Sequence, residues 1–443
     1  MAYTLNSLEK KLKDSKEARD TIRAMLAIKR SQKNDNRIKW SGLFAVPPSS
    51  SMERVLKAFV TETDIPLELP FFTFLYFISG YLVSKDAKIK SFLGEFYPDI
   101  WTVVLAPSGS GKTLTHDVFK KHAPAKSNFP EPASGAAFIK AFEENNPARW
   151  FQDEVAQKLK QIETTGSPLA DCKEYLLRAY GNDKIERTTK RDQITIEKPL
   201  ITILGLNTFE SFVKALSAES LLDGFAQRFA FVIAEKDPAR PMIDFPLYNF
   251  EKLESAVIGA FEKLTNTTIH QEYELDSSSI EAFRQSFKLL CRDNIPESFF
   301  RRIMFRAFKY ALIYHVMLGK DSNKIDAEDI GWGARVSSMH IDDIHKIVKT
   351  DEGEKTLDLI TRAINYIEKR INEGKEVKAR DVQMNVKGVK TAEQAKIFLG
   401  MFDESELKGK VVDVQPKAPM TTTKNEVDEA FGWIDNELNN CLG

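Results

Sequence analysis

The sequence predicts an α/β protein, and three observations lead to this class. An apolar run at residues 100–105 has the length and composition of a buried strand, and a Gly/Ser-rich loop and a helical pattern follow it directly. Strand-like and helix-like segments then alternate up to about residue 235, as expected of an α/β core. Residues 250–348 are almost wholly helical in period. A chain of 443 residues is too long for one typical core, so several domains are expected.

The loop after the first strand reads APSGSGKT at residues 106–113, the pattern of a phosphate-binding loop. Small residues at 108–111 suit a tight turn whose backbone N–H groups converge on an anion. We expect Lys112 to reach the β- and γ-phosphates of ATP and the Thr113 hydroxyl to bind Mg²⁺. Ala106 departs from the pattern, which has glycine there. The predicted nucleotide contacts are Ala106, Pro107, Ser108, Gly109, Ser110, Gly111, Lys112, Thr113 and Leu114.

The remaining segments predict helical regions on both sides of this core. An amphipathic helix at 356–373, two short helices and a strand at 410–416 suggest a winged helix at the carboxyl end. The predicted organisation is a helical arm and linker at 1–50, a helical region at 51–98, a nucleotide-binding core at 99–248, a helical lid at 249–350, and a winged-helix-like domain with a tail at 351–443.

Composition limits the class of protein. Lys and Arg number 63 and Asp and Glu 64, a net charge of −1, so any contact with nucleic acid must come from a local basic patch. Cys172, Cys291 and Cys441 are far apart in the sequence, which excludes a CxxC metal site and indicates a reducing compartment. The amino terminus is polar and the most apolar stretch, residues 67–83, contains Glu68. We therefore expect a cytoplasmic protein with no membrane span.

A second acidic element is expected to complete the ATP site. Asp153 and Glu154 follow a short aromatic stretch; Asp153 would hold the metal and Glu154 would polarise the attacking water. An alternative remains open, because acid pairs are also common at the start of a helix such as the one that follows.

The clearest buried strand, residues 199–206, delivers Asn207 at its carboxyl end. Asn207 is a candidate sensor of the attacking water beside the γ-phosphate. It is equally a candidate cap for the following helix, TFESFVKAL, since asparagine favours that position. Both roles are compatible with each other.

The segment LLDGFAQRF at 221–229 places Arg228 just before another strand, 230–234. It resembles the arginine finger of AAA+ ATPases, and especially a segment of minichromosome maintenance helicases. The resemblance implies that Arg228 reaches the γ-phosphate bound by a neighbouring copy. The alternative is a surface arginine paired with an acid such as Asp223.

Two further arginines lie on the long helical run at 298–318. Arg302 or Arg306 resembles the lid arginine of AAA+ proteins, called sensor 2, which touches the γ-phosphate. A solvated basic helix face is the alternative for either residue.

Taken together, residues from about 60 to 348 resemble a family of ATPases of phages and mobile elements, often joined to primase modules. APSGSGKT, the Asp-Glu pair, ITILGLNTFESF and DGFAQRF carry this resemblance, in that order. It implies a helicase-like ATPase of DNA replication that acts as a ring, expected to be a hexamer, on single-stranded or forked DNA. No primase motif is present, so a primase or polymerase partner would be a separate protein.

Contact with DNA needs residues of its own. The segment 184–196 predicts a hairpin whose basic side chains would meet the DNA backbone in the pore of such a ring. A solvent-exposed hairpin with scattered charge is the alternative. The predicted contacts are Lys184, Arg187, Lys190 and Arg191, with weaker candidates in the winged helix at Lys378, Arg380, Lys387 and Lys390.

Two functions from different classes therefore remain open. The first is an ATP-driven DNA helicase or translocase. The second is a nucleotide-switched DNA-binding or loading factor that does not unwind DNA. A small-molecule kinase ranks last, because the long helical region and the winged helix would have no purpose in it.

Overall fold

The computed structural model describes residues 41–91, 94–124, 129–188, 193–215, 225–237, 240–243, 247–291, 297–348, 351–399 and 407. The arm predicted at the amino terminus, the strand predicted at 410–416 and the tail lie outside the described residues, apart from the short helix η2 (Ser41–Ala45). The chain divides into two compact units, one ending at Glu354 and one beginning at Lys355.

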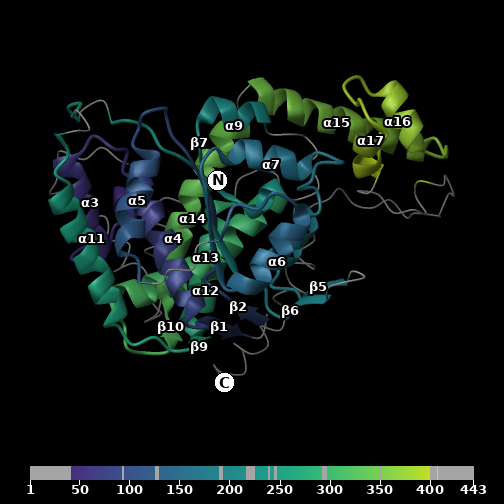
Figure 1. Ribbon diagram of the computed structural model, residues 1–443. Coiled ribbons are helices and arrows are strands. Elements are labelled where there is room, and N and C mark those ends of the chain that lie inside the picture. Colours follow the sequence, from purple (N-terminus) through teal and green to yellow (C-terminus); the bar gives the residue numbers. More distant parts are fainter. Residues whose placement is uncertain are drawn as a thin grey trace. The chain divides into compact units, whose positions relative to one another are not determined.

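The first unit is a mixed α/β structure built around a parallel sheet of order β4-β7-β3-β8 (Figure 1). The strands are β3 (Trp101–Leu105), β4 (Ala148–Gln152), β7 (Ile201–Asn207) and β8 (Ala230–Ile233). Every residue of β3, β7 and β8 is buried, as apolar runs covered on both faces require. Leu105 pairs with both Asn207 and Ile233, so the carboxyl ends of these strands meet at one edge.

Helices cover both faces of this sheet. On one face, Ser79 of α4 (Glu68–Ser84) lies 3.0 Å from the hydroxyl of Thr202, and α5 (Lys112–His122) packs beside α4. On the other face, Val155 packs against Gly205, where a Cβ would meet it at 2.8 Å. The helices of this second face are α6 (Gly135–Asn145), α7 (Val155–Glu163), α8 (Cys172–Tyr180) and α9 (Phe209–Ala215). The sheet is therefore the middle of three layers.

The region expected to be a lid belongs to the same compact unit as the sheet. Its helices are α11 (Phe250–Thr265), α12 (Ser277–Leu290), α13 (Glu297–Leu318) and α14 (Ala327–Val348). Helix α11 packs against α5 and α3 (Ser51–Glu62), and α14 packs against β8. Phe77, Phe119 and Phe261 form one aromatic cluster that joins α4, α5 and α11. None of the helices that the structure describes has both the length and the apolar character needed to cross a bilayer.

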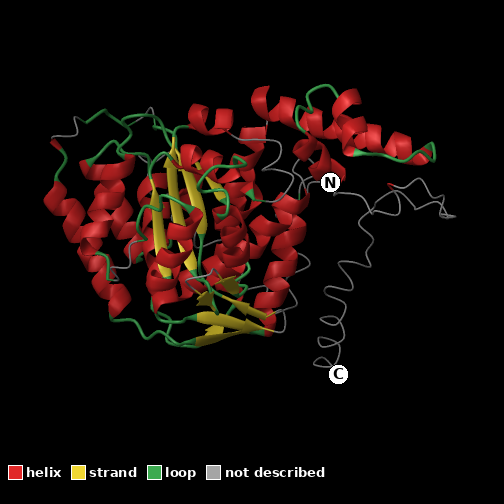
Figure 2. Ribbon diagram, turned by 45° about the vertical axis from the view of Figure 1, so that its right-hand side comes forward, coloured by secondary structure: helices red, strands yellow, loops and turns green. Residues whose placement is uncertain are grey.

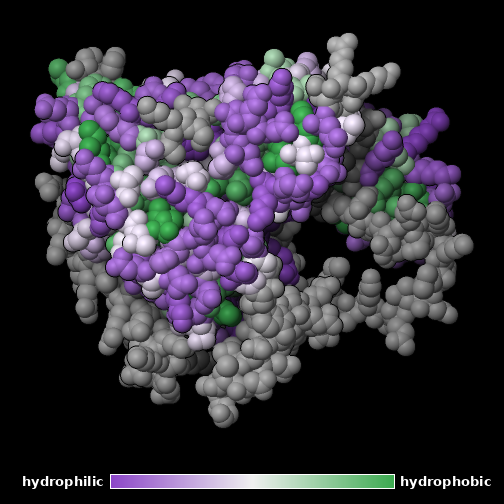
Figure 3. All heavy atoms as spheres, turned by 60° about the horizontal axis from the view of Figure 1, so that its bottom comes forward, coloured by the Kyte–Doolittle hydropathy of each residue, from purple (hydrophilic) through white to green (hydrophobic). Residues whose placement is uncertain are grey.

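A second, smaller sheet of order β10-β9-β1-β2 lies below the first in Figure 2. Its strands are β1 (Lys88–Ser91), β2 (Gly94–Phe96), β9 (Glu272–Leu275) and β10 (Lys324–Ile325), and none was expected from the sequence. They have two to four residues each, too few for a periodic pattern to be recognised. Figure 3 shows that hydrophobic residues form small separate patches among hydrophilic ones on this side of the molecule.

The second unit contains three described helices. They are α15, which begins just before the unit (Asp351–Asn372), α16 (Ala379–Asn385) and α17 (Ala392–Leu399). Helices α16 and α17 pack together, and the amide of Val377 donates to the carbonyl of Leu407 at 2.9 Å. The order of three helices follows the sequence pattern, and the strand that would complete a winged helix lies outside the described residues.

Candidate functional site

The loop of residues 106–111 joins the carboxyl end of β3 to the first turn of α5. Two of its glycines have left-handed backbone angles, with φ of 71° at Gly109 and 78° at Gly111. Only glycine adopts such angles without strain, so the conformation explains why the sequence has glycine at both positions. The loop is tied to the sheet by the amide of Ala106, which donates to the carbonyl of Asn207 at 2.9 Å.

Lys112 is the first residue of α5, and its side chain turns back over the loop. Its Nζ donates to the carbonyl oxygens of Ala106 at 3.1 Å and Pro107 at 2.9 Å. The first four N–H groups of a helix have no partner within the helix, so they and the ammonium group form a positive end suited to an anion. Because the predicted loop, lysine and helix start are adjacent, this end of α5 has the donors that a phosphate chain requires.

The acid pair predicted at 153–154 lies beside this loop. Asp153 follows β4, which is separated from β3 only by β7. The Thr113 hydroxyl donates to Oδ2 of Asp153 at 2.8 Å. The structure thus brings together two residues predicted from separate motifs to share one metal ion.

These two oxygen donors fit Mg²⁺, which takes one or two carboxylates and completes its shell with water and phosphate oxygens. Thr113 and Asp153 would hold the ion, and Mg²⁺ would neutralise charge on the phosphates of bound ATP. Within the described ranges no group of three or more His, Cys, Asp or Glu side chains could hold a metal by itself.

Glu154 is exposed and has a left-handed backbone, with φ of 53°. For a residue other than glycine this angle is uncommon and costs about 1–2 kcal/mol. Its amide donates to Oδ1 of Asp153 at 3.0 Å, and helix α7 starts at the next residue. Both interpretations of the acid pair fit this geometry, since the pair precedes a helix and also borders the loop.

Asn207 is fully buried at the end of β7, between the strand that carries the loop and the strand that carries Asp153. Its Oδ1 accepts from the amide of Ala156 at 3.1 Å, in the first turn of α7. It therefore does not cap the helix that follows it, α9; Thr208 accepts there from Ser211 at 3.4 Å. Through its carbonyl and its side chain, Asn207 fixes the start of the loop relative to the Asp153–Glu154 turn.

Arg228 lies at the opposite edge of the sheet from the loop. It lies two residues before β8, and Ala230 pairs with Thr102 near the amino end of β3. Arg228 is therefore level with residue 100, and the distance from there along the strands to Ala106 is about 20 Å, at roughly 3.3 Å per residue. The Arg228 guanidinium lies over the ring of Tyr180, 5.5 Å from its centroid. Arg228 does not reach the phosphate loop of its own copy.

The structure does not bring the candidate lid arginines to the loop. Arg306 is 1% exposed, and its Nη2 donates to the carbonyl of Gln227 at 2.9 Å, at the amino edge of β8. Arg302 is half-buried one turn earlier on the same helix, about 6 Å along its axis. The helical periodicity identified the helix correctly, but could not show that it packs near the far edge of the sheet.

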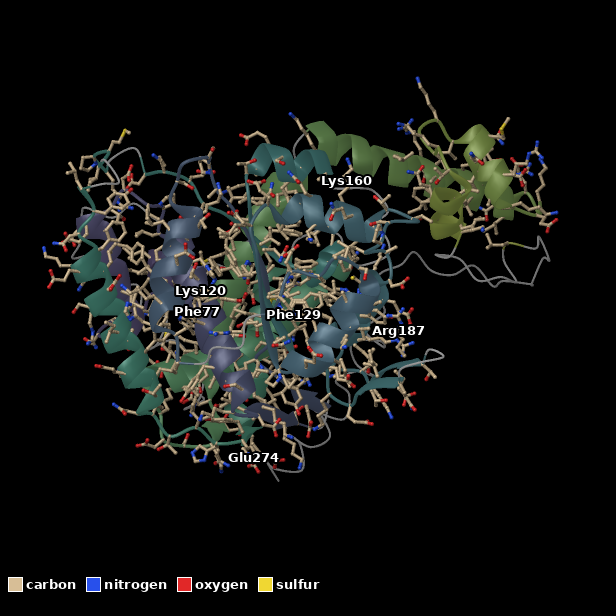
Figure 4. All side chains as sticks on the ribbon, in the orientation of Figure 1. Phe77, Lys120, Phe129, Lys160, Arg187 and Glu274 are labelled. Carbon is tan, nitrogen blue, oxygen red and sulfur yellow. The ribbon has the colours of Figure 1, made fainter. Side chains whose placement is uncertain are left out.

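The predicted hairpin is present as β5 (Ile185–Thr188) paired with β6 (Gln193–Ile196). Lys184 is ion-paired with Glu186 at 2.7 Å and with Glu197 at 2.9 Å, so its charge is largely neutralised locally. Arg187 is half-buried on β5, and Figure 4 shows it on the hairpin. Lys190 and Arg191 lie outside the described residues. The local charge of this hairpin is more mixed than the basic residues alone suggested.

Ile65 forms the back of the loop, and it was not expected from the sequence. A Cβ added to Gly111 would meet Cδ1 of Ile65 at 2.7 Å. Arg240 holds this segment in place by donating to the carbonyls of Ile65 at 2.7 Å and Phe59 at 3.1 Å. The two contacts join positions more than 40 residues apart, and no local pattern in the sequence marks them.

His116, on α5, is another residue near the loop that carries no signal in the sequence. Its ring stacks on Phe151 with centroids 3.6 Å apart, and burial lowers the pKa of the imidazole to about 4. The side chain is therefore neutral at pH 7. It contributes to packing between α5 and β4.

No protein-family model matches this chain. A search of curated proteins also found no match.

Proposed function

We propose that this chain is a P-loop ATPase related to AAA+ proteins and that it acts as an ATP-driven DNA helicase or translocase. The observation that carries the proposal is the hydrogen bond of 2.8 Å between Thr113 and Asp153. It places a hydroxyl at the end of a glycine-rich loop beside a carboxylate at the end of another parallel strand. Paired donors in this position suit the Mg²⁺ of a bound nucleoside triphosphate.

Each neighbouring residue then has a role in hydrolysis. Lys112 and the first amides of α5 bind the β- and γ-phosphates. Glu154 accepts a proton from water as the water oxygen bonds to the γ-phosphorus, and the bond from phosphorus to the leaving oxygen of ADP breaks. Asn207 holds the two sides of the site at a fixed distance, as its bond to Ala156 supports.

Arg228 would act on a neighbouring copy. Its position at the far edge of the sheet is compatible with that role, because it lies too far away to serve its own loop. An ATP site that needs a residue from another copy exists only in an oligomer. Head-to-tail contacts give a ring or a filament, and a two-fold contact gives a dimer. We propose a ring, expected to be a hexamer, with ATP hydrolysed between subunits.

DNA is the proposed substrate of the motor. Arg187, with Lys190 and Arg191, would contact the phosphate backbone from the hairpin. The second unit, as a winged helix, would add further contacts with the DNA backbone. The residues for these contacts, all exposed, are Lys378, Arg380, Lys387 and Lys390. Priming or synthesis would belong to a separate primase or polymerase, and the cytoplasm is the proposed location.

A nucleotide-switched loading factor is the second candidate. The ion pairs of Lys184 favour it, since a hairpin with neutralised charge grips a moving strand less firmly than a basic one. The two functions share the ATP site and differ in whether DNA strands are separated.

A strand-displacement assay on forked DNA distinguishes them. The full chain is tested with ATP and Mg²⁺ beside Lys112→Ala. Displacement by the wild type alone supports the helicase. ATP hydrolysis without displacement supports the loading factor and contradicts the proposed motor.

A further inference from the structure

Tyr180, the last residue of α8, has two cationic side chains against its ring. The guanidinium of Arg228 lies 5.5 Å from the ring centroid and the ammonium of Lys309 lies 5.1 Å from it. The ring of Trp101 meets it edge to face, with centroids 5.2 Å apart at 77°. An aromatic face attracts cations through its quadrupole, so Tyr180 provides a fixed surface on which Arg228 rests.

The other side of this arrangement is anchored to the sheet. Lys309 donates to Oδ1 of Asp99 at 2.8 Å, and both side chains are buried. Asn182 donates to Oδ2 of the same carboxylate at 3.1 Å. Asp99 lies two residues before β3, the strand whose other end carries the phosphate loop. A buried ion pair with additional hydrogen bonds has little freedom to move, so the ring and its cations are held in one position.

We propose that Tyr180 is a positioning residue that sets the direction of the Arg228 guanidinium toward a neighbouring copy. Arg228 and Tyr180 are both half-buried, so each keeps part of its surface exposed to solvent. An arginine side chain has several rotatable bonds, and holding it in advance saves the entropy of ordering it when the copies meet. Through Lys309 and Asp99, the same contact joins Arg228 to the strand that bears the subunit's own loop.

The face of the Tyr180 ring contacts the Arg228 guanidinium, and the hydroxyl is not needed for this contact. Among the described residues, the buried hydroxyl of Tyr180 has no hydrogen-bond partner. Tyr180→Phe therefore keeps the contact with Arg228, whereas Tyr180→Leu removes it. Tyr180→Met is a second variant without a ring, and it fills the space with a flexible side chain.

This inference rests on the proposed role of Arg228, and the experiment separates the two. ATP turnover and ATP affinity are measured for the wild type, Arg228→Ala, Tyr180→Phe, Tyr180→Leu, Tyr180→Met and the double variant Arg228→Ala/Tyr180→Leu. We expect Tyr180→Leu and Tyr180→Met to lower turnover about 10-fold with ATP affinity unchanged, and Tyr180→Phe to match the wild type. The double variant should turn over ATP as slowly as Arg228→Ala and no slower, because Tyr180 acts through Arg228.

Tyr175→Leu is the matched control. Tyr175 lies on the same helix and stacks on Phe138, with centroids 6.4 Å apart. The Tyr175→Leu variant should turn over ATP at the wild-type rate. Normal turnover in Tyr180→Leu or Tyr180→Met overturns the inference and leaves the proposed function intact. Slower turnover in the double variant than in Arg228→Ala has the same meaning. Normal turnover in Arg228→Ala overturns the shared site and this inference together.

Discussion

The hydroxyl of Thr113 donates a hydrogen bond of 2.8 Å to the carboxylate of Asp153, across 40 residues of sequence. The two residues follow strands β3 and β4, which are separated by β7 in the parallel sheet. Because the carboxyl ends of parallel strands share one edge, the topology brings a residue from each motif into contact.

Thr113→Ala is expected to raise the Mg²⁺ concentration needed for ATP hydrolysis by at least about 10-fold, because one of the two oxygen donors is lost. Thr113→Ser keeps the hydroxyl and is the matched control. A Mg²⁺ titration of hydrolysis by both variants checks this. Equal Mg²⁺ requirements in the alanine and serine variants would contradict the assigned donor.

Glu154→Gln is expected to bind ATP normally and to hydrolyse it about 10²–10⁴ times more slowly, since the amide cannot accept the proton of the attacking water. Glu131→Gln is the control: this exposed acid accepts from Gln152, the neighbour of Asp153, at 2.7 Å. Single-turnover hydrolysis and nucleotide binding are measured for both variants. Full activity of Glu154→Gln would reject its role as base.

Gly111→Ala and Gly109→Ala provide a matched pair at similar backbone angles. Each adds strain of about 1–2 kcal/mol, because both φ values are positive. A Cβ at position 111 would meet Ile65 at 2.7 Å, whereas one at position 109 would have no described residue within 4 Å. Gly111→Ala should therefore weaken ATP binding more than Gly109→Ala. Ile65→Ala should restore part of that loss, and binding measured by calorimetry that shows no restoration would exclude the contact as the cause.

His340 makes stability depend on pH. Burial lowers the pKa of its imidazole to about 3. The neutral ring accepts from the Tyr310 hydroxyl at 2.8 Å and donates to the carbonyl of Phe231 at 3.0 Å. Below about pH 6.5 the unfolded chain takes up a proton on this histidine, whereas the native state does so only near pH 3. The free energy of unfolding therefore falls as the pH drops from about 6.5 to about 3.

The wild type is compared with His340→Gln at each pH. Burial raises the pKa of Asp343 to about 6, which changes the unfolding free energy in the opposite direction. Because Asp343 is present in both proteins, its contribution drops out of the difference between them. Between pH 7 and pH 5 the advantage of the wild type in unfolding free energy should shrink by about 2 kcal/mol. Urea unfolding at both pH values measures it. A difference that stays constant with pH would show that His340 does not titrate as a buried neutral group.

Long apolar runs were the most predictable part of the fold. The segments at 100–105, 199–206 and 230–234 became β3, β7 and β8, because strands buried on both faces consist almost entirely of apolar residues. Helices α12 and α13 also follow the predicted periods closely. Strands as short as β10, with two residues, give no such pattern.

Within the site, residues that belong to a local motif could be predicted from the sequence, and contacts between distant segments could not. The loop and the acid pair could be recognised because each is a contiguous motif with its own chemistry. The contact of Ile65 with Gly111, the support of Arg228 by Tyr180 and the burial of Arg306 depend on packing between distant segments. Residue type alone could not distinguish Arg306, on a buried helix face, from an arginine that meets a phosphate.

Mg²⁺-dependent ATP hydrolysis by the full chain, compared with Lys112→Ala, tests directly whether the loop at 106–113 is a nucleotide site. Lys112 is the cation whose Nζ lies over the loop, so its loss should abolish both ATP binding and hydrolysis. The wild type should turn over ATP, and turnover should fall to background in the variant. Unchanged ATP affinity and turnover in Lys112→Ala would contradict the assignment of this loop as the nucleotide site.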